Sequence, residues 1–432
     1  MAYINLEGKK KIALNSNSRM EKTQKRIIDL LFITWDGPQT SYMEGLFMPI
    51  FQEVARNEDV NFHILQFTWA DDKKISHTKE VAKKMGIQYT ALPILRKPNV
   101  SIGSLLTVFT SSGKIKKYIQ QNNIDIVMPR STFPAMMVNQ ILGAGKVPFR
   151  GFRGKLIFDA DGLPIEERID FAGLKKDALQ YKLMKSAETK MLKSAAAVIT
   201  RSQKAIDVHV KTIGEESRDK FSVVFNGRDK DLFKLNNELR QQVRQELGLE
   251  NEFLFVYAGS LGPQYCFPEM LKIFANHTYK NNAKFLILTG NLEFAEQNIP
   301  EELKGRIILK SVKSDEVPLY LNAADLAFAL RKPTFSMQGV APIKLGEYLL
   351  CGLPVIASKG IGDTDDILAN FEECYLYDHS FGLEAQEEKI NDFLEKAIFA
   401  DKKNMAAKAQ EYFSLEAAAE SYITIIRRIT VN

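Results

Sequence analysis

Short apolar segments of strand type alternate with helical segments along most of the chain, and the alternation restarts at residue 253. The strands predicted in the first half are 27–34, 60–67, 89–95, 124–128, 155–159, 196–200 and 221–225; those in the second half include 253–258, 284–290, 306–309 and 355–357. Helices between consecutive strands favour parallel strands in a doubly wound α/β sheet. Because 432 residues exceed one ordinary core, we predict two Rossmann-like domains.

Composition and cysteine usage narrow the class of protein. The chain is 45% hydrophobic and 26% charged, as expected for a globular protein. Three widely spaced cysteines and five scattered histidines show neither a disulfide framework nor zinc-site spacing, so we expect no metal and no cofactor. A net charge of +5 does not indicate a nucleic-acid partner. Residues 1–26 are polar and basic, without a signal-peptide core, and are expected to form a tail on a cytoplasmic protein.

The segment 331–368 carries the most specific pattern in the chain. A polar loop leads into a helix predicted to begin near Ala341, to place Lys344 and Glu347 one turn apart, and to end at Cys351-Gly352. Backbone amides and a lysine at such a helix start suit a diphosphate, and a carboxylate suits ribose hydroxyls. The alternative interpretation is a solvated ion pair between the two side chains.

The run PIKLGEYLLCGLPVIAS, residues 342–358, resembles the donor-site signature of family-4-type retaining glycosyltransferases of GT-B fold. It is most similar to the bacterial branch that builds surface polysaccharides. The resemblance implies two doubly wound domains facing across a cleft, 27–227 for the acceptor and 228–414 for the nucleotide-sugar donor, with helix 415–430 returning to the first. It implies that Glu347 contacts ribose, whereas Gly339 stands where the family usually has a hexose-binding glutamate.

The segment Asn226-Gly227-Arg228-Asp229 is similar to the interdomain junction of the same family, where valine usually occupies the position of Arg228. An ordinary Asn-Gly turn is the alternative interpretation. The family often has an Arg/Lys diphosphate clamp after the first glycine loop of the second domain, and residues 263–266 lack it. Arg331 and Lys344 are the candidates to replace it, although a structural surface arginine remains an alternative for Arg331.

Parallel sheets bind ligands beyond the carboxyl ends of their strands, and this rule selects the remaining donor-site candidates. Glycines allow close approach of a phosphate, Ser336 offers a hydroxyl, and the resemblance points to Val312 for the base. The candidates for donor binding are Gly259, Ser260, Gly262, Val312, Arg331, Ser336, Gly339, Val340, Ala341, Lys344 and Glu347. Lys344 is also a catalytic candidate, because it would stabilise the departing diphosphate without a metal.

On the acceptor side, Asp159-Ala160-Asp161 ends a predicted strand. It has the Asp-x-Asp form of a manganese motif from another glycosyltransferase fold, but its place favours Asp161 as a residue that orients or deprotonates an acceptor hydroxyl. A structural turn is the alternative. Gly37, Arg130 and Glu166 are further acceptor-side candidates by location.

A lysine-rich helical stretch, 174–193, either contacts anionic lipid at the inner face of the membrane or forms a solvated helix face. The sequence therefore predicts a metal-independent hexosyltransferase that moves a sugar from a nucleotide-sugar to a glycan or lipid-linked acceptor in surface-polysaccharide or glycoconjugate synthesis. Two alternatives stay open: a nucleotide-sugar 2-epimerase of the same fold, and a silent sugar-nucleotide-binding subunit, suggested by Gly339 and the missing clamp.

Overall fold

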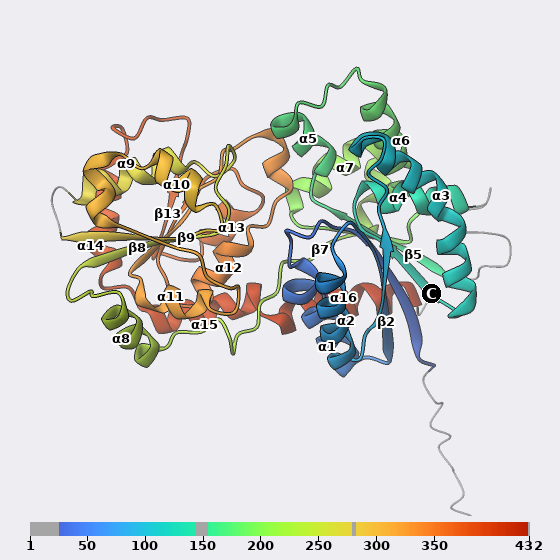
Figure 1. The fold of residues 1–432 in the computed structure, drawn as a ribbon, viewed down its shortest axis with the longest axis horizontal. Helices are drawn as coiled ribbons and strands as arrows, with labels where there is room; N and C mark the ends of the chain where they lie inside the picture. Colours follow the sequence, from blue (N-terminus) through green and yellow to red (C-terminus); the bar gives the residue numbers. More distant parts are fainter. Residues whose placement is uncertain (1–25, 143–153, 279–281, 431–432) are drawn as a thin grey trace, which may run out of the picture.

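The computed structural model describes residues 26–142, 154–278 and 282–430. Apart from Arg26, the predicted tail of residues 1–26 lies outside the described residues. The chain forms two α/β lobes joined side by side, each built on a central twisted sheet with helices on both faces (Figure 1). Among the described helices, none combines the length and apolarity needed to cross a bilayer.

The first sheet is parallel throughout, in the order β3-β2-β1-β4-β5-β6-β7. Its strands are β1 (Ile28–Trp35), β2 (Val60–Thr68), β3 (Gln88–Pro93), β4 (Ile126–Pro129), β5 (Lys155–Asp161), β6 (Ala197–Thr200) and β7 (Phe221–Val223). Its helices are α1 (Met48–Asn57), α2 (Asp72–Lys84), α3 (Val100–Gln121), α4 (Thr132–Ile141), α5 (Pro164–Ala172), α6 (Leu179–Ser194) and α7 (Gln203–Ile213). The strand order reverses between β1 and β4, which opens a crevice at their carboxyl ends.

The second sheet repeats this arrangement in the order β10-β9-β8-β11-β12-β13. Its strands are β8 (Phe253–Ala258), β9 (Ala283–Leu288), β10 (Ile307–Lys310), β11 (Leu326–Ala329), β12 (Val355–Ser358) and β13 (Cys374–Tyr377). Its helices are α8 (Asn237–Glu246), α9 (Phe267–Thr278), α10 (Leu292–Asn298), α11 (Val317–Ala323), α12 (Ile343–Leu350), α13 (Thr364–Leu368), α14 (Glu387–Ala397) and α15 (Lys402–Phe413). The reversal here lies between β8 and β11.

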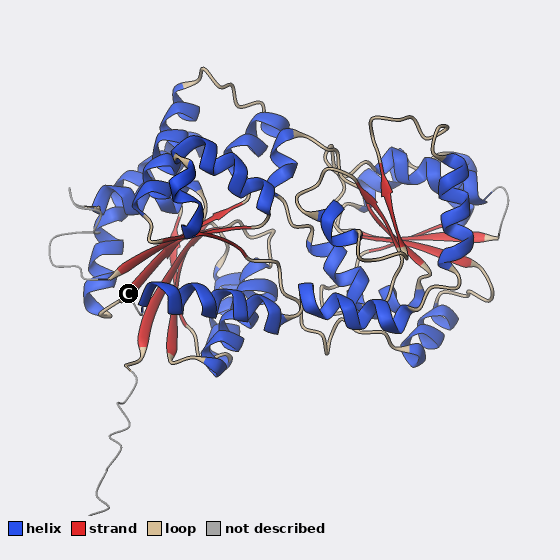
Figure 2. Ribbon diagram, turned by 180° about the vertical axis from the view of Figure 1, so that it is seen from behind, coloured by secondary structure: helices blue, strands red, loops and turns tan. Residues whose placement is uncertain are grey.

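Both faces of each sheet are buried, as apolar strand sequences require. In β1, Leu31 and Ile33 face one core, whereas Leu30 and Phe32 face the opposite one. The second of these cores includes α16 (Leu415–Thr430), which follows the second domain in sequence yet packs against α1 of the first. The predicted return of the C-terminal helix is therefore present: in Figure 1, α15 lies along the lower side of the second lobe and α16 along that of the first, and Figure 2 shows the same arrangement from behind.

The first helix begins without the cap that its sequence favours. Ser41 and Glu44 have capping-box spacing, yet the helix there opens with a π-helical turn, Met43–Phe47, that has no side-chain cap. Glu44 instead accepts a hydrogen bond from Thr78 and lies 2.8 Å from Lys74 Nζ, both on α2. A tertiary ion pair thus replaces the local cap.

Candidate functional site

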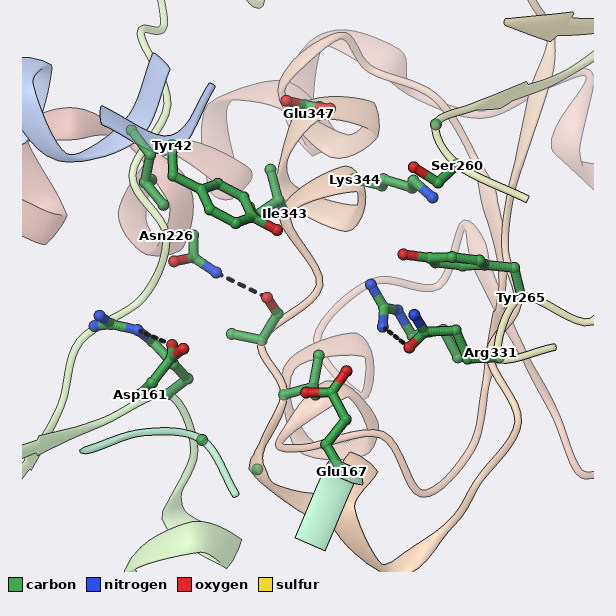
Figure 3. A pocket seen from close by; sticks show the side chains of 18 of the residues that line it. Tyr42, Asp161, Glu167, Asn226, Ser260, Tyr265, Arg331, Ile343, Lys344 and Glu347 are labelled. Carbon is green, nitrogen blue, oxygen red and sulfur yellow. Dashed lines mark hydrogen bonds and ion pairs between the residues drawn. The ribbon is translucent and has the colours of Figure 1, made fainter. Parts of the chain in front are cut away.

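A cavity of about 550 Å³ lies between the two domains, at the carboxyl ends of the strands where each sheet reverses its order. Figure 3 shows side chains from both domains pointing into it. The second domain contributes the loops after β8 and β11 and the start of α12, and the first contributes residues after β4, β5 and β7. This is the place where doubly wound sheets bind ligands.

Lys344, on the first turn of α12, is a buried cation on the wall of this cavity. Its Nζ donates a hydrogen bond to Tyr257 Oη at 2.7 Å and lies 4.3 Å from the ring centres of Tyr257 and Tyr265. A Cβ at Gly259 would lie 2.2 Å from Lys344 Cε, so only glycine leaves room for the lysine. Burial, assisted by nearby Arg331, holds the pKa of Lys344 well below its ordinary value. A bound anion would therefore stabilise the charged form of Lys344.

Glu347 lines the cavity one turn further along α12, but its partner is not the one considered from sequence. Its Oε1 lies 2.9 Å from Arg228 Nε, and both side chains are 13% exposed. Arg228 also donates to the carbonyl of Gly45 in the first domain. Among the described residues Lys344 and Glu347 form no ion pair with each other, and Arg228 instead ties the Glu347 carboxylate to the segment between the domains.

Gly339 touches the first domain through its backbone. A Cβ at this position would lie 2.7 Å from Leu163 N and 2.9 Å from the carbonyl carbon of Gly162, so a side chain cannot be accommodated with the domains in this arrangement. Nearby, Asn226 donates a hydrogen bond of 2.8 Å to the Ala341 carbonyl across the same gap. Close contact between the domains therefore favours glycine at position 339 over any residue with a side chain.

Arg331 faces the cavity and is not a surface residue. Its guanidinium stacks 4.9 Å from the centre of the Tyr265 ring, on which Lys344 also lies, and its Nη1 is 3.4 Å from Gln264 Oε1. Two cations therefore share one aromatic ring, and within the described residues neither makes an ion pair with a carboxylate. Ser336 lines the same cavity, although it is 1% exposed.

On the opposite wall, the partly exposed Asp161 belongs to a cluster of three carboxylates and two arginines, which are Asp36, Asp159, Asp161, Arg130 and Arg201. Arg130 Nη2 lies 2.6 Å and Arg201 Nε 3.4 Å from Asp161, while Arg201 Nη2 lies 2.6 Å from Asp159. Burial disfavours the charged form of Asp161, but the two guanidinium groups outweigh it and lower the pKa of this carboxyl. Asp161 is therefore held as an anion and is a weak base, and the arginines occupy the positions that a cation bound by Asp-x-Asp would need.

Glu166 does not line the cavity, so its placement on the acceptor side is wrong. Its Oε1 pairs with Lys185 Nζ at 2.8 Å inside the first domain, where Lys185 also binds Glu188. Glu167 lines the cavity instead, and burial raises its pKa despite the opposing charge of Arg331. Neighbouring helical residues point about 100° apart, so only one of the two glutamates faces the cleft.

The structure brings together most of the residues predicted from sequence. Those that line the cavity are Gly259, Ser260, Arg331, Ser336, Gly339, Val340, Ala341, Lys344 and Glu347 with Asp161 and Arg130 from the first domain. Those outside its lining are Gly262, Val312 and Gly37; Gly37 packs against Trp69. The residues that sequence reasoning missed include Tyr42, Arg201 and Tyr265, whereas Glu167 belongs to the group of carboxylates that the sequence places on the cleft side. In the sequence, residue 265 draws attention only because it is not basic, although the Tyr265 ring contacts both Arg331 and Lys344.

Three possible metal ligands also lie together outside the cavity lining. The ligand atoms of Cys266, Glu269 and His379 are within 4.8 Å of one another, although the sequence separates the histidine by more than 100 residues. His379 Nε2 lies 2.8 Å from Ser358 Oγ, and burial raises the pKa of Cys266 to about 12. Because a metal binds the thiolate form, this environment does not favour a cation there.

Comparison with known proteins agrees with the fold. Residues 240–412 match the sequence family described as Glycosyl transferases group 1. A search of curated protein sequences found no match. Among solved structures, Anabaena HepE in complex with UDP is similar over 93% of this chain and 100% of its own, with 17% identity and a TM-score of 0.66.

Two other solved structures show the same architecture. Sucrose-phosphate synthase from Thermosynechococcus elongatus is 15% identical over 94% of this chain and 99% of its own, with a TM-score of 0.65. A putative UDP-N-acetylglucosamine 2-epimerase from Listeria monocytogenes is 12% identical over 94% of this chain and 98% of its own, with a TM-score of 0.57. The chain therefore has the GT-B fold, and residues 240–412 of its second domain are similar to the Glycosyl transferases group 1 family.

Proposed function

We propose that this protein is a retaining glycosyltransferase that moves a hexose from a nucleotide-sugar to a glycan or lipid-linked acceptor. Its role would lie in surface-polysaccharide or glycoconjugate synthesis, on the cytoplasmic side of the membrane. One observation carries the proposal: the interdomain cavity places two cations, Lys344 and Arg331, beside a glycine loop, in a domain similar to the group 1 family. HepE, which has the same fold, was crystallised with UDP.

The donor half of the site suits departure of a nucleoside diphosphate. Lys344 and Arg331 face the cavity and would stabilise the negative charge that grows on the leaving phosphate, to which the backbone amides at the start of α12 would add fixed dipoles. These two side chains take the place of the clamp that residues 263–266 lack. We infer that the reaction needs no metal, and transfer in the presence of EDTA at the rate seen without it is the expected result.

The acceptor half offers two carboxylates with different tasks. Asp161, fixed by Arg130 and Arg201, is suited to accept a hydrogen bond from a sugar hydroxyl. Glu167 lines the same cavity and is suited to orient the acceptor hydroxyl. Retention fits a reaction in which the leaving phosphate takes the proton of the incoming hydroxyl on the same face of the sugar.

A panel of nucleotide-sugars tests this function in two steps. Thermal shift identifies the donor that stabilises the protein most, and NMR of the anomeric proton then follows that donor with and without a sugar acceptor. Acceptor-dependent transfer with unchanged anomeric configuration is expected. Conversion of the donor alone into its 2-epimer would favour the epimerase, whose fold is shared. Binding without transfer or hydrolysis across donors and acceptors would favour a silent subunit and overturn the proposal.

A further inference from the structure

A second cavity, of about 410 Å³, lies inside the first domain and is lined mainly by apolar side chains. Its walls come from the ends of β1 and β2 and from α3, α4, α5 and α6. The aromatic and aliphatic residues around it are Trp35, Trp69, Ile94, Val100, Leu105, Phe133, Met136, Leu179, Leu183 and Met184. This apolar cavity differs from the interdomain one, whose walls carry most of the charged residues described above.

The apolar cavity lies next to the interdomain cavity. In two places one residue lines the apolar cavity and its neighbour in sequence lines or contacts the interdomain one. On α5, Arg168 lines the apolar cavity and Glu167 lines the interdomain one. At the end of β1, Trp35 lines the apolar cavity, while the next residue, Asp36, lies 3.9 Å from Arg130 of the interdomain cavity. A ligand that filled the apolar cavity would therefore have its other end close to the proposed acceptor site.

Two guanidinium groups stand in the walls of the apolar cavity. Arg96 lies 4.8 Å from the centre of the Trp69 ring, and Arg168 lies 5.0 Å from that of Phe133. Neither arginine makes an ion pair with another described residue. Burial lowers the pKa of Arg168, since it disfavours the charge that an anionic partner would stabilise. An apolar space with cations facing it suits a molecule that joins a hydrocarbon chain to an anion.

The mouth of the cavity has the same dual character. Val100 and Leu179 are lining residues that are 51% and 72% exposed. Exposed lysines stand close by in sequence, at Lys175, Lys176 and Lys182. Other lysines of the same stretch turn inward: Lys185 pairs with Glu166 and Glu188, and Lys190 donates to the Asn139 carbonyl. Three exposed lysines of this stretch therefore stand within four residues of the lining residues Leu179 or Leu183.

We propose that the apolar cavity binds the hydrocarbon chain of a lipid-phosphate acceptor, with Arg96 and Arg168 binding its phosphate. The sugar end then reaches Glu167 and Asp161 in the interdomain cavity. This inference rests on the proposed glycosyl transfer and selects a lipid-linked acceptor over a free glycan. Charge complementarity supports it, because unpaired arginines in an apolar wall suit a phosphate attached to an apolar chain.

Intrinsic fluorescence tests the inference directly, because the chain has two tryptophans and both line the apolar cavity. The protein is titrated with decyl phosphate below its micelle concentration, without nucleotide. We expect a saturable change in tryptophan emission, at least tenfold weaker binding of decanol, and no change with inorganic phosphate. An emission change of equal affinity with decanol would contradict the phosphate role of the arginines.

Two variants locate the binding. Ser104→Phe fills the cavity from α3 and should abolish the emission change, whereas the matched Ser186→Phe, on the exposed part of α6, should retain it. Arg168→Gln should weaken decyl phosphate at least tenfold. Binding by Ser104→Phe at parental affinity would mean adhesion to the surface and would overturn the inference.

Stabilisation by UDP, measured on the same variants, separates the two proposals. It should be unchanged in Ser104→Phe, which also shows that the variant is folded. If UDP binds and sugar transfer to a soluble glycan proceeds while decyl phosphate does not bind, the lipid site is wrong and the glycosyltransferase proposal stands.

Discussion

Replacing Lys344 by methionine is the sharpest probe of the donor site. The ammonium is buried against Tyr257 and Tyr265, and within the described residues it has no carboxylate partner. A hydrogen bond to a charged group contributes about 1.5–3 kcal/mol, so its loss should weaken UDP binding by about 10- to 150-fold. Methionine keeps the apolar stem and removes the charge, which separates electrostatics from packing.

The pKa of Lys344 gives this prediction a second, independent signature. Burial lowers this pKa in the free protein, and a bound diphosphate should raise it again, so UDP binding takes up a proton. In the pH range between the free and bound pKa values, affinity should therefore fall by up to about tenfold per pH unit as the pH rises. Above about pH 7.5 the diphosphate itself is fully ionised and does not obscure the effect.

Calorimetry measures both quantities, since titrations in buffers of different ionisation enthalpy give the number of protons taken up. Lys344→Met should bind UDP weakly with no proton uptake, whereas Lys272→Met, an exposed lysine on α9, should behave like the parent. Lys344→Met should also raise the unfolding temperature of the nucleotide-free protein at pH values below the ordinary lysine pKa. In the parent, unfolding there adds a proton to Lys344, which favours the unfolded state, and methionine removes this effect. Parental affinity and parental proton uptake in this variant would refute the assignment of the site.

Three further substitutions test the contacts around the interdomain cavity. Arg228→Val leaves Glu347 without its partner and should lower the free energy of unfolding by about 1–3 kcal/mol in urea titrations. Arg228→Lys should give a value between those of Arg228→Val and the parent. An unchanged urea midpoint in Arg228→Val would contradict the ion pair. Gly339→Ala places a Cβ against the backbone of Gly162 and should separate the domains, so X-ray scattering should give a larger radius of gyration, and an equal radius would contradict the steric argument. Asp161→Asn should lower the unfolding temperature at pH 7, and this loss should shrink below about pH 4, where the carboxyl is protonated in the unfolded chain; a loss that grows with acidity would contradict the lowered pKa.

The fold could be predicted because its signals are local. Runs of buried apolar residues between helices are sufficient to indicate two parallel sheets, and α12 begins and ends within two residues of the expected positions. The edge strand β13 was not predicted: three of its four residues are only partly buried, so the segment lacks the strong apolar signal of a central strand.

The candidate site was predictable only as far as single side chains could be placed on elements. The position of Lys344 follows from helix geometry. Its burial, however, depends on Tyr257 in β8 and Tyr265 in the loop after β8, which lie about 80 residues earlier in the chain. The Glu347–Arg228 pair joins residues 119 positions apart and has no local signature. The choice between Glu166 and Glu167 depended on Lys185, which belongs to the next helix.

The path of the chain between the lobes has a mechanical consequence. The polypeptide passes from the first lobe to the second near Arg228 and returns near Ser414, and these two residues form a β-bridge side by side. Because the two connections lie side by side, the lobes should open mainly by rotating about an axis through Arg228 and Ser414. The first lobe cannot complete its core until α16, the last helix, has been synthesised. Until then an apolar face of the first lobe stays exposed, and we expect chaperones to bind it.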